Sequence, residues 1–230
     1  MKMKVLITVS CFFLTLISAM GQQSEVRKVG TFRGIKSGQA IDVYLKKGDK
    51  ESVKVESLQA LSDVVTEISG SYLKIHMRDD MRFKSSKKDV KVYVTYVEID
   101  KISASSASNI FSEGAIKTGA MEIHASSAAN IEVSLDVTSV EVHASSAGDV
   151  VLEGKAKTIN ADVSSAGEID AYNLTTESGE ASASSGGSVK ITVSTGLEAH
   201  ASSGGSIRYR GNPMKTNTNS SSGGSVTRSN

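Results

Sequence analysis

The chain has 230 residues, with 26 basic and 25 acidic side chains and a formal net charge of +1. This balance gives no electrostatic case for nucleic-acid binding. Aromatic residues make up 5%, tryptophan is absent and there is one cysteine, so a large aromatic core and a disulfide framework are excluded.

Residues 1–21 have the composition of a secretory signal. Two lysines stand near the start, and the apolar stretch 5–17, which holds Cys11, is too short to span a bilayer. A small-x-small triplet at 19–21 predicts cleavage before Gln22. We therefore expect export to the periplasm, the outer surface or the medium, and a mature chain without a membrane span.

Residues 22–100 predict irregular β-structure. Alternating apolar and polar residues predict strands at 40–45, 52–56, 64–68, 73–77 and 90–99. Two stretches that begin with Ser-Gly, 37–45 and 69–77, predict early rungs of a coil. A short helical turn is expected at Gln59–Asp63. The basic run Arg82, Lys84, Lys87, Lys88 and Lys91 predicts a solvated loop before a strand, with a polyanion-binding patch as the alternative.

Residues 101–230 repeat one motif seven times. The copies are ASSASNI, ASSAANI, ASSAGDV, VSSAGEI, ASSGGSV, ASSGGSI and SSSGGSV, with the first serine at 105, 126, 145, 164, 184, 202 and 221. A fixed period near 19 residues is typical of a solenoid, and the alternation within each copy predicts strands with one buried face. The expected fold is all-β, a right-handed parallel β-helix that runs as one continuous solenoid over 22–230.

The second serine of each pair has the parity of the buried isoleucine and valine positions. Because the same repeat position lies over itself about 4.8 Å away in the next rung, we predict an internal hydroxyl ladder. Its members are Ser106, Ser127, Ser146, Ser165, Ser185, Ser203 and Ser222. Seven equivalent copies without an inward base argue against nucleophilic serines. Loops are expected where the period stretches, at 112–119, 153–158, 172–180 and 210–217, and the last contains the sole proline, Pro213.

One outward column lies two positions before each first serine. It places His124, His143 and Asp162 in consecutive rungs, beside Glu122 and Glu141. Two imidazoles and a carboxylate at this spacing could share a metal such as zinc. The alternative is an exposed polar column without a ligand.

A second outward column lies four positions after each first serine. Its members Asn109, Asn130, Asp149 and Glu168 predict a corner and a candidate ligand-facing wall, with Asn109 over Asn130 as an amide ladder. Rows of amides and hydroxyls suit carbohydrate, although the chain has few aromatic residues for sugar stacking.

Motifs for catalysis are absent from the sequence. There is no calcium-binding nonapeptide, no phosphate loop and no His-Glu-x-x-His helix. The acids Glu122, Glu141 and Asp162 have no lysine or arginine in their column. We therefore expect a non-enzymatic protein without a cofactor. The alternatives are a carbohydrate-active enzyme and a structural or assembly protein of the cell envelope.

Four segments occur in a specific order: Phe32-x-x-Ile35, residues 69–75 (SGSYLKI), residues 90–96 (VKVYVTY) and residues 209–213 (YRGNP), around the serine rungs. The whole pattern resembles the head GIN domain family of auto-transporter adhesins, exported proteins of Bacteroidetes-type envelopes. The resemblance implies a β-helical exported protein with an adhesive role, binding a glycan or a cell-surface protein. Since only four residues follow the last motif, we also expect either a C-terminal run that folds back or a homo-oligomer through that end.

Overall fold

The computed structural model of the protein describes residues 23–58, 60–78 and 90–229. The signal predicted at 1–21, Gln59 and the basic positions 82–88 lie outside the described residues. Within these ranges we find no helix with the length and apolarity that crossing a bilayer requires.

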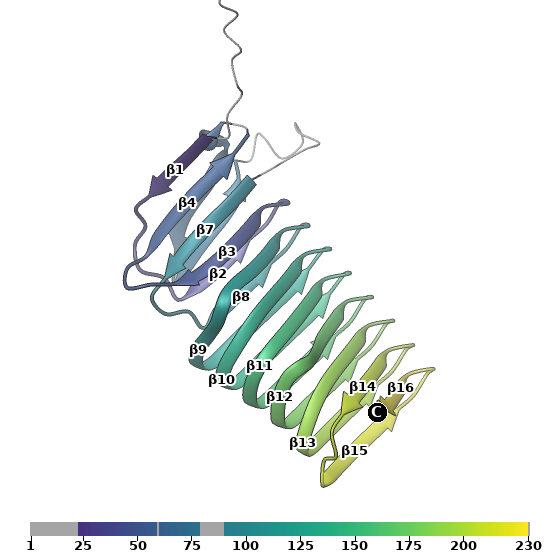
Figure 1. The fold of residues 1–230 in the computed structure, drawn as a ribbon. Coiled ribbons are helices and arrows are strands. Elements are labelled where there is room, and N and C mark those ends of the chain that lie inside the picture. The colour runs from purple at the N-terminus through teal and green to yellow at the C-terminus, as the bar shows by residue number, and fades with distance from the viewer. Residues whose placement is uncertain (1–22, 59, 79–89, 230) are drawn as a thin grey trace, which may run out of the picture.

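Apart from one short 3-10 helix, the regular secondary structure of the described residues is all β-strand (Figure 1). The N-terminal elements are β1 (Gln23–Arg27), β2 (Gly34–Ser37), β3 (Asp42–Lys47), β4 (Ser52–Ser57), the short 3-10 helix η1 (Leu61–Asp63), β5 (Val64–Ser69), β6 (Tyr72–Met77), β7 (Val90–Tyr96) and β8 (Lys101–Ala104). The repeat region contains β9 (Asn109–Ser126), β10 (Asn130–Ser145), β11 (Asp149–Val163), β12 (Glu168–Ala183), β13 (Ser188–Ala201), β14 (Ser206–Arg210), β15 (Lys215–Ser220) and β16 (Ser225–Arg228). The five predicted N-terminal strands and the predicted turn are thus confirmed as β3 to β7 and η1.

Strands β9 to β13 are successive parallel turns of one coil (Figure 1). Ile110, Ile131, Val150, Ile169 and Val189 pair in register along the coil, and each is fully buried. Large aliphatic side chains at one repeat position therefore stack into a continuous core. This confirms the parallel β-solenoid with turns of about 19 residues that the serine pairs predict.

Each turn of the coil contributes to two faces. The first face contains β1, β4, β7 and β3, the first halves of β9 to β13, and β14 and β16. The second face contains β5, β6, β2 and β8, the second halves of β9 to β13, and β15. Apolar side chains from the two faces meet in one core, and the alternate side chains point outward.

The bends between the two faces do not interrupt the strands. The loops predicted at 112–119, 153–158 and 172–180 are wrong, because each segment lies within a continuous strand. Parallel hydrogen bonding continues around the bend, and shifts in register, such as that between Val151 and Glu153, absorb extra residues as bulges. At 210–217 the chain does leave the ladder, between the end of β14 and the start of β15.

The serine pairs form the sharp corner that leads from the second face to the first. In one rung, Ser127 and Ala128 are exposed and have φ of 54° and 59°, while Ala125 and Ala129 on either side are buried. The amide of Ala129 donates to the carbonyl of Ser126 at 3.2 Å. A four-residue turn with positive φ at both central positions has the signature of a type I′ turn.

The predicted internal hydroxyl ladder is therefore wrong. The second serine of every pair is exposed at a turn tip with positive φ: Ser106, Ser127, Ser146, Ser165, Ser185, Ser203 and Ser222. The ladder at this corner is made by the main chain instead, where the amide of Ala107 donates to the carbonyl of Ser127 at 3.0 Å. The serines thus mark where the coil turns, and their hydroxyls do not line its interior.

The N-terminal segments mix coil and hairpin. Strands β2 and β3 flank a corner at Gln39 and Ala40, both with positive φ, and pair with β8 and β9, which confirms the rung predicted at 37–45. The rung predicted at 69–77 is confirmed only for its strand, because β6 pairs parallel with β2 whereas β5 and β6 pair antiparallel. The two-residue connection Gly70-Ser71, with φ of 62° at Gly70, favours a hairpin over a corner.

Antiparallel strands close the N-terminal end of the coil, with β1 beside β4 and β5 beside β6. Arg27 links the two faces, since its guanidinium donates to the carbonyls of Val64 at 2.6 Å and Leu61 at 2.7 Å. These charge-assisted bonds stabilise the N-terminal end of the core.

The last rung is polar at positions that are apolar in the rung before it. Thr216, Thr218 and Ser220 pair with Leu197, Ala199 and Ala201. A terminal repeat with a polar outer side is the usual cap of a solenoid. Within the described residues the C-terminal segment continues as β15 and β16, so the predicted folding back is wrong. The homo-oligomer through this end stays a prediction.

Candidate functional site

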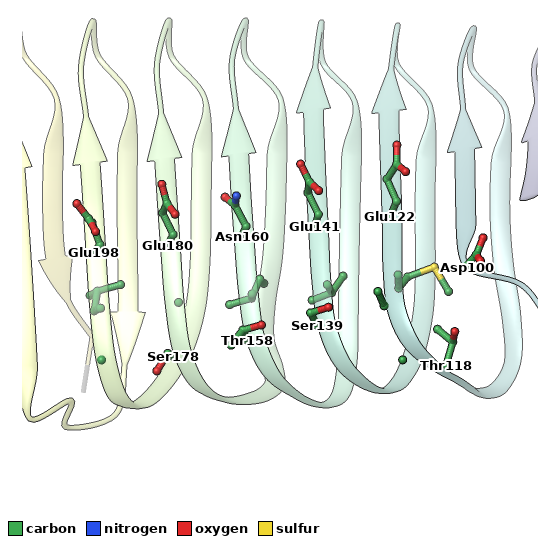
Figure 2. Close-up of a pocket in the computed structure, with 18 of the residues that line it drawn as sticks. Asp100, Thr118, Glu122, Ser139, Glu141, Thr158, Asn160, Ser178, Glu180 and Glu198 are labelled. Carbon is green, nitrogen blue, oxygen red and sulfur yellow. The ribbon is translucent and has the colours of Figure 1, made fainter.

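A groove of about 1150 Å³ crosses successive turns on the second face (Figure 2). Its floor contains small outward side chains that pair in register: Ala120, Ser139, Thr158, Ser178 and Gly196. Short side chains at this repeat position leave open space above the sheet, whereas the neighbouring outward position carries long ones. The groove therefore follows from the repeat and runs along the coil.

A row of acids stands along the groove, here called the glutamate column: Glu122, Glu141, Glu180 and Glu198, with Asn160 in the third place (Figure 2). They come from β9, β10, β12, β13 and β11, one from each turn. The side chains of Glu141 and Glu198 are 57% and 53% exposed. Parallel pairing thus brings carboxylates from distant segments to one wall at a rung spacing of about 4.8 Å.

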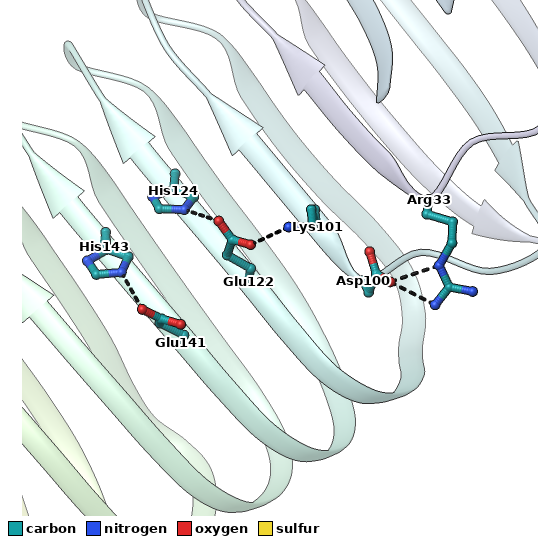
Figure 3. A network of polar contacts seen from close by, with 7 residues as sticks. All are labelled: Arg33, Asp100, Lys101, Glu122, His124, Glu141 and His143. Atoms are coloured by element: carbon teal, nitrogen blue, oxygen red, sulfur yellow. Dashed lines mark hydrogen bonds and ion pairs between the residues drawn. The ribbon is translucent and has the colours of Figure 1, made fainter. Parts of the chain in front are cut away.

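Basic residues neutralise one end of this row (Figure 3). Lys101 contacts Glu122 at 2.7 Å, and Arg33 contacts Asp100 at 2.7 Å and Glu98 at 2.9 Å. The hydrogen bond from Lys101, followed by that from His124, holds the pKa of Glu122 below its ordinary value. Glu122 is thus stabilised as a carboxylate. It is a poor candidate for the protonated acid that glycoside hydrolysis requires.

The histidine column lies next to the glutamate column. His124, His143 and Asp162 pair in consecutive rungs, as their repeat position predicts. The nitrogen Nε2 of His124 lies 2.7 Å from Glu122, and that of His143 lies 3.0 Å from Glu141 (Figure 3). His200 repeats this contact with Glu198 at 3.1 Å. Sequence spacing places the histidine column and its neighbours Glu122 and Glu141 correctly, but the Glu-x-His contact along one strand is visible only in the structure.

The two adjacent imidazoles stack face to face. The ring centroids of His124 and His143 lie 4.8 Å apart with 8° between the ring planes. A nitrogen lone pair lies in the plane of its own ring, so the two rings direct their lone pairs side by side and do not converge. Among the described residues, no group of three histidine, cysteine or acidic side chains is arranged to hold a metal. The zinc site stays a prediction that requires different side-chain rotamers.

The wall predicted on the first face is assembled in register. Asn109, Asn130, Asp149 and Glu168 pair along successive turns. Asn109 donates to Asp42 at 2.7 Å and Asn130 donates to Glu132 at 2.9 Å, so these amides bind carboxylates and not each other. Burial, followed by repulsion from Glu168, raises the pKa of Asp149. Much of the hydrogen-bonding capacity of this wall is therefore already used within the protein.

The first face also contains an aromatic column that the sequence does not reveal. Tyr44 stacks on Tyr93 with ring centroids 5.2 Å apart and on Phe111 with centroids 5.4 Å apart. Lys54 lies 5.7 Å from the ring centroid of Tyr93. Because Tyr44 has a ring on each side, neither of its faces is open for stacking on a sugar, and the column stabilises the sheet. Knowledge of the β3–β7 and β3–β9 pairings was needed to find it.

The family described as "Putative auto-transporter adhesin, head GIN domain" matches residues 31–213. No curated protein matches the chain. A crystal structure of a "putative adhesin" from Bacteroides fragilis is similar over 91% of this chain and 97% of its own, with 20% identity and a TM-score of 0.81. A "putative adhesin" from Parabacteroides merdae (16% identity, TM-score 0.75) covers 91% and 96%. A "putative lipid binding protein" from Parabacteroides distasonis (17% identity, TM-score 0.67) covers 91% and 97%. At these identities the likeness shows the shared fold.

Proposed function

The chain belongs to the head GIN domain family of auto-transporter adhesins, and from this premise we propose that it is an exported, non-enzymatic binding module of the cell envelope. Its ligand is an extended polymer, a glycan, that lies in the groove of the second face. The observation that carries this proposal is the continuity of the groove, which presents equivalent side chains on successive turns.

A repeating groove suits a repeating ligand. Each further unit of a polymer meets another copy of the same contacts, so weak individual contacts add up along the chain. The hydroxyls of Ser139, Thr158 and Ser178 on the floor can both donate and accept hydrogen bonds. This arrangement favours a linear ligand over a compact small molecule.

The enzyme and the purely structural protein remain the rival functions. The lowered pKa of Glu122 makes this one carboxyl group a poor proton donor for an enzyme. If the protein is purely structural, we expect it to bind no glycan. If it is an enzyme, we expect it to release reducing sugar from envelope polysaccharides.

A glycan array with groove variants tests the proposal. Thr158→Tyr fills the groove with a residue that strands tolerate well, and Thr175→Tyr places the same ring on an exposed strand position outside the groove. We expect the wild type and Thr175→Tyr to bind the same glycans, and Thr158→Tyr to lose them. Asn130→Tyr tests the predicted wall of the first face. Equal binding by wild type and Thr158→Tyr, or no glycan binding by the wild type, would refute the groove as the ligand site.

A further inference from the structure

We propose that the polymer bound in the groove is cationic, a glycan whose sugar units carry free amino groups. This inference rests on the proposed function and adds the charge and the repeat of the ligand. Three features of the groove support it: carboxylates without a lysine or arginine partner, their spacing, and the kinds of side chain that line the groove.

The first feature is the charge in the middle of the glutamate column. Within the described residues, no lysine or arginine pairs with Glu141, Glu180 or Glu198, whereas Lys101 and Arg33 pair with Glu122 and Asp100 at one end. The contacts of Glu141 and Glu198 are with the imidazoles of His143 and His200, and Lys215 lines the groove without an ion pair to the column. Negative charges of like sign on neighbouring rungs repel one another at this spacing. A cationic ligand would relieve that repulsion, so the groove is complementary to positive charge.

The second feature is the spacing of the carboxylates. They repeat at each turn of the coil, about 4.8 Å apart, with one neutral rung at Asn160. In an extended β-1,4-linked glycan successive sugar units face opposite ways, so the amino groups on one side recur at every second unit, about two rungs apart, and could meet every second carboxylate. Side chains on one side of an extended peptide recur only about every 6.6 Å, so a basic peptide would drift out of register. The spacing therefore favours an amino-glycan over a basic peptide.

The third feature is the lining of the groove. Among the described residues that line it there is no aromatic side chain. Neutral sugars are held in many sites by stacking on aromatic rings, and that contribution is missing here. Ion pairs with ammonium groups, together with hydroxyl contacts to Ser139 and Thr158, would supply the attraction instead.

Two hexamers of equal length provide the test, glucosamine hexamer and N-acetylglucosamine hexamer, measured by calorimetry on the purified protein at a pH where the amines are protonated. We expect at least tenfold tighter binding of the glucosamine hexamer. Affinity should rise with length from dimer to hexamer. It should fall when the ionic strength increases from about 0.01 M to about 0.15 M, because the screening length shortens from about 30 Å to about 8 Å.

Matched triple variants separate the groove from general electrostatic attraction. Glu141→Gln with Glu180→Gln and Glu198→Gln neutralises the column, whereas Glu132→Gln with Glu153→Gln and Glu177→Gln removes the same charge from positions that do not line the groove. Because exposed ion pairs are individually weak, the loss of three of them predicts binding roughly tenfold weaker for the groove variant. The control variant should bind like the wild type, and circular dichroism confirms that both are folded.

The outcomes distinguish this inference from the proposed function. Equal binding of the two hexamers, binding of neither, or equal losses in the two triple variants would overturn the cationic ligand. In each of those cases the Thr158→Tyr result on the array decides separately whether the groove is the ligand site. Tight, selective binding of the glucosamine hexamer that Thr158→Tyr leaves unchanged would place the cationic site elsewhere and overturn both proposals.

Discussion

Replacing the alanines at the turn tips by glycine should stabilise the protein. Ala107, Ala128, Ala147 and Ala166 have φ of 58° or 59°, whereas later rungs place Gly186, Gly204 and Gly223 at the same position with φ of 74° to 76°. A left-handed conformation costs an L-residue about 1–2 kcal/mol, and glycine loses about 0.4–1 kcal/mol more backbone entropy on folding. The net gain is about 0.5 kcal/mol per site and about 2 kcal/mol for the fourfold variant.

Urea and thermal unfolding followed by circular dichroism measure this gain. For a chain of this size, about 2 kcal/mol corresponds to a rise in Tm of roughly 4–8 °C. The reverse change, Gly204→Ala, isolates the backbone effect, because a Cβ at Gly204 would meet no atom within 4 Å. We expect it to destabilise the protein by about 0.5–1 kcal/mol.

The same chemical change in the strand provides the control with the opposite sign. Ala125 and Ala144 are buried, 2% exposed, and outside the positive-φ region. Changing either to glycine removes a packed methyl group and increases the conformational entropy of the unfolded chain. The free energy of unfolding should therefore fall by about 1–2 kcal/mol. A destabilised fourfold turn variant, or a stabilised Ala125→Gly, would refute the assignment of the serine pairs to left-handed turns.

Three further predictions concern stability and pH. Ser37 is 2% exposed and its hydroxyl has no partner in the described residues, so Ser37→Ala should raise the free energy of unfolding in urea by about 1 kcal/mol. Ser108→Ala should lower it by about the same amount, because that hydroxyl donates to the Ser37 carbonyl. The raised pKa of Asp149 means that the folded protein holds this proton more tightly than the unfolded chain does, so stability falls as the pH rises above the ordinary range of aspartate. Asp149→Asn should therefore raise Tm at pH 7 and leave it unchanged near pH 3, and an equal shift at both would contradict a carboxylate destabilised by burial and by repulsion from Glu168. Arg27→Ala should cost about 2 kcal/mol through the lost bonds between the two faces, and a neutral result in urea unfolding would show that the N-terminal end is closed without it.

The site was only partly predictable from the sequence. The repeat register places His124 over His143 and Glu122 beside Glu141, and the pairings agree. The groove was not predicted, because its depth depends on how the outward positions before the glutamates, such as Ser139 and Thr158, lie at the bend. The aromatic column was also missed, since the paired residues of β3 and β7 are 49 positions apart in the sequence and share no motif.

The repeat alone determined the coil, since identical positions stacked about 4.8 Å apart must share one environment and Ile131 and Val150 are apolar in register. It could not determine the corner. Ala125 and Ala129 are both buried whether the chain between them is extended or turns back, because the three intervening residues keep the same parity. Only tertiary structure decides between the two, through the positive φ of Ser127 and Ala128 and the main-chain bonds that close the turn. Because the chain turns back at this corner, the hydroxyls of the second serines face water.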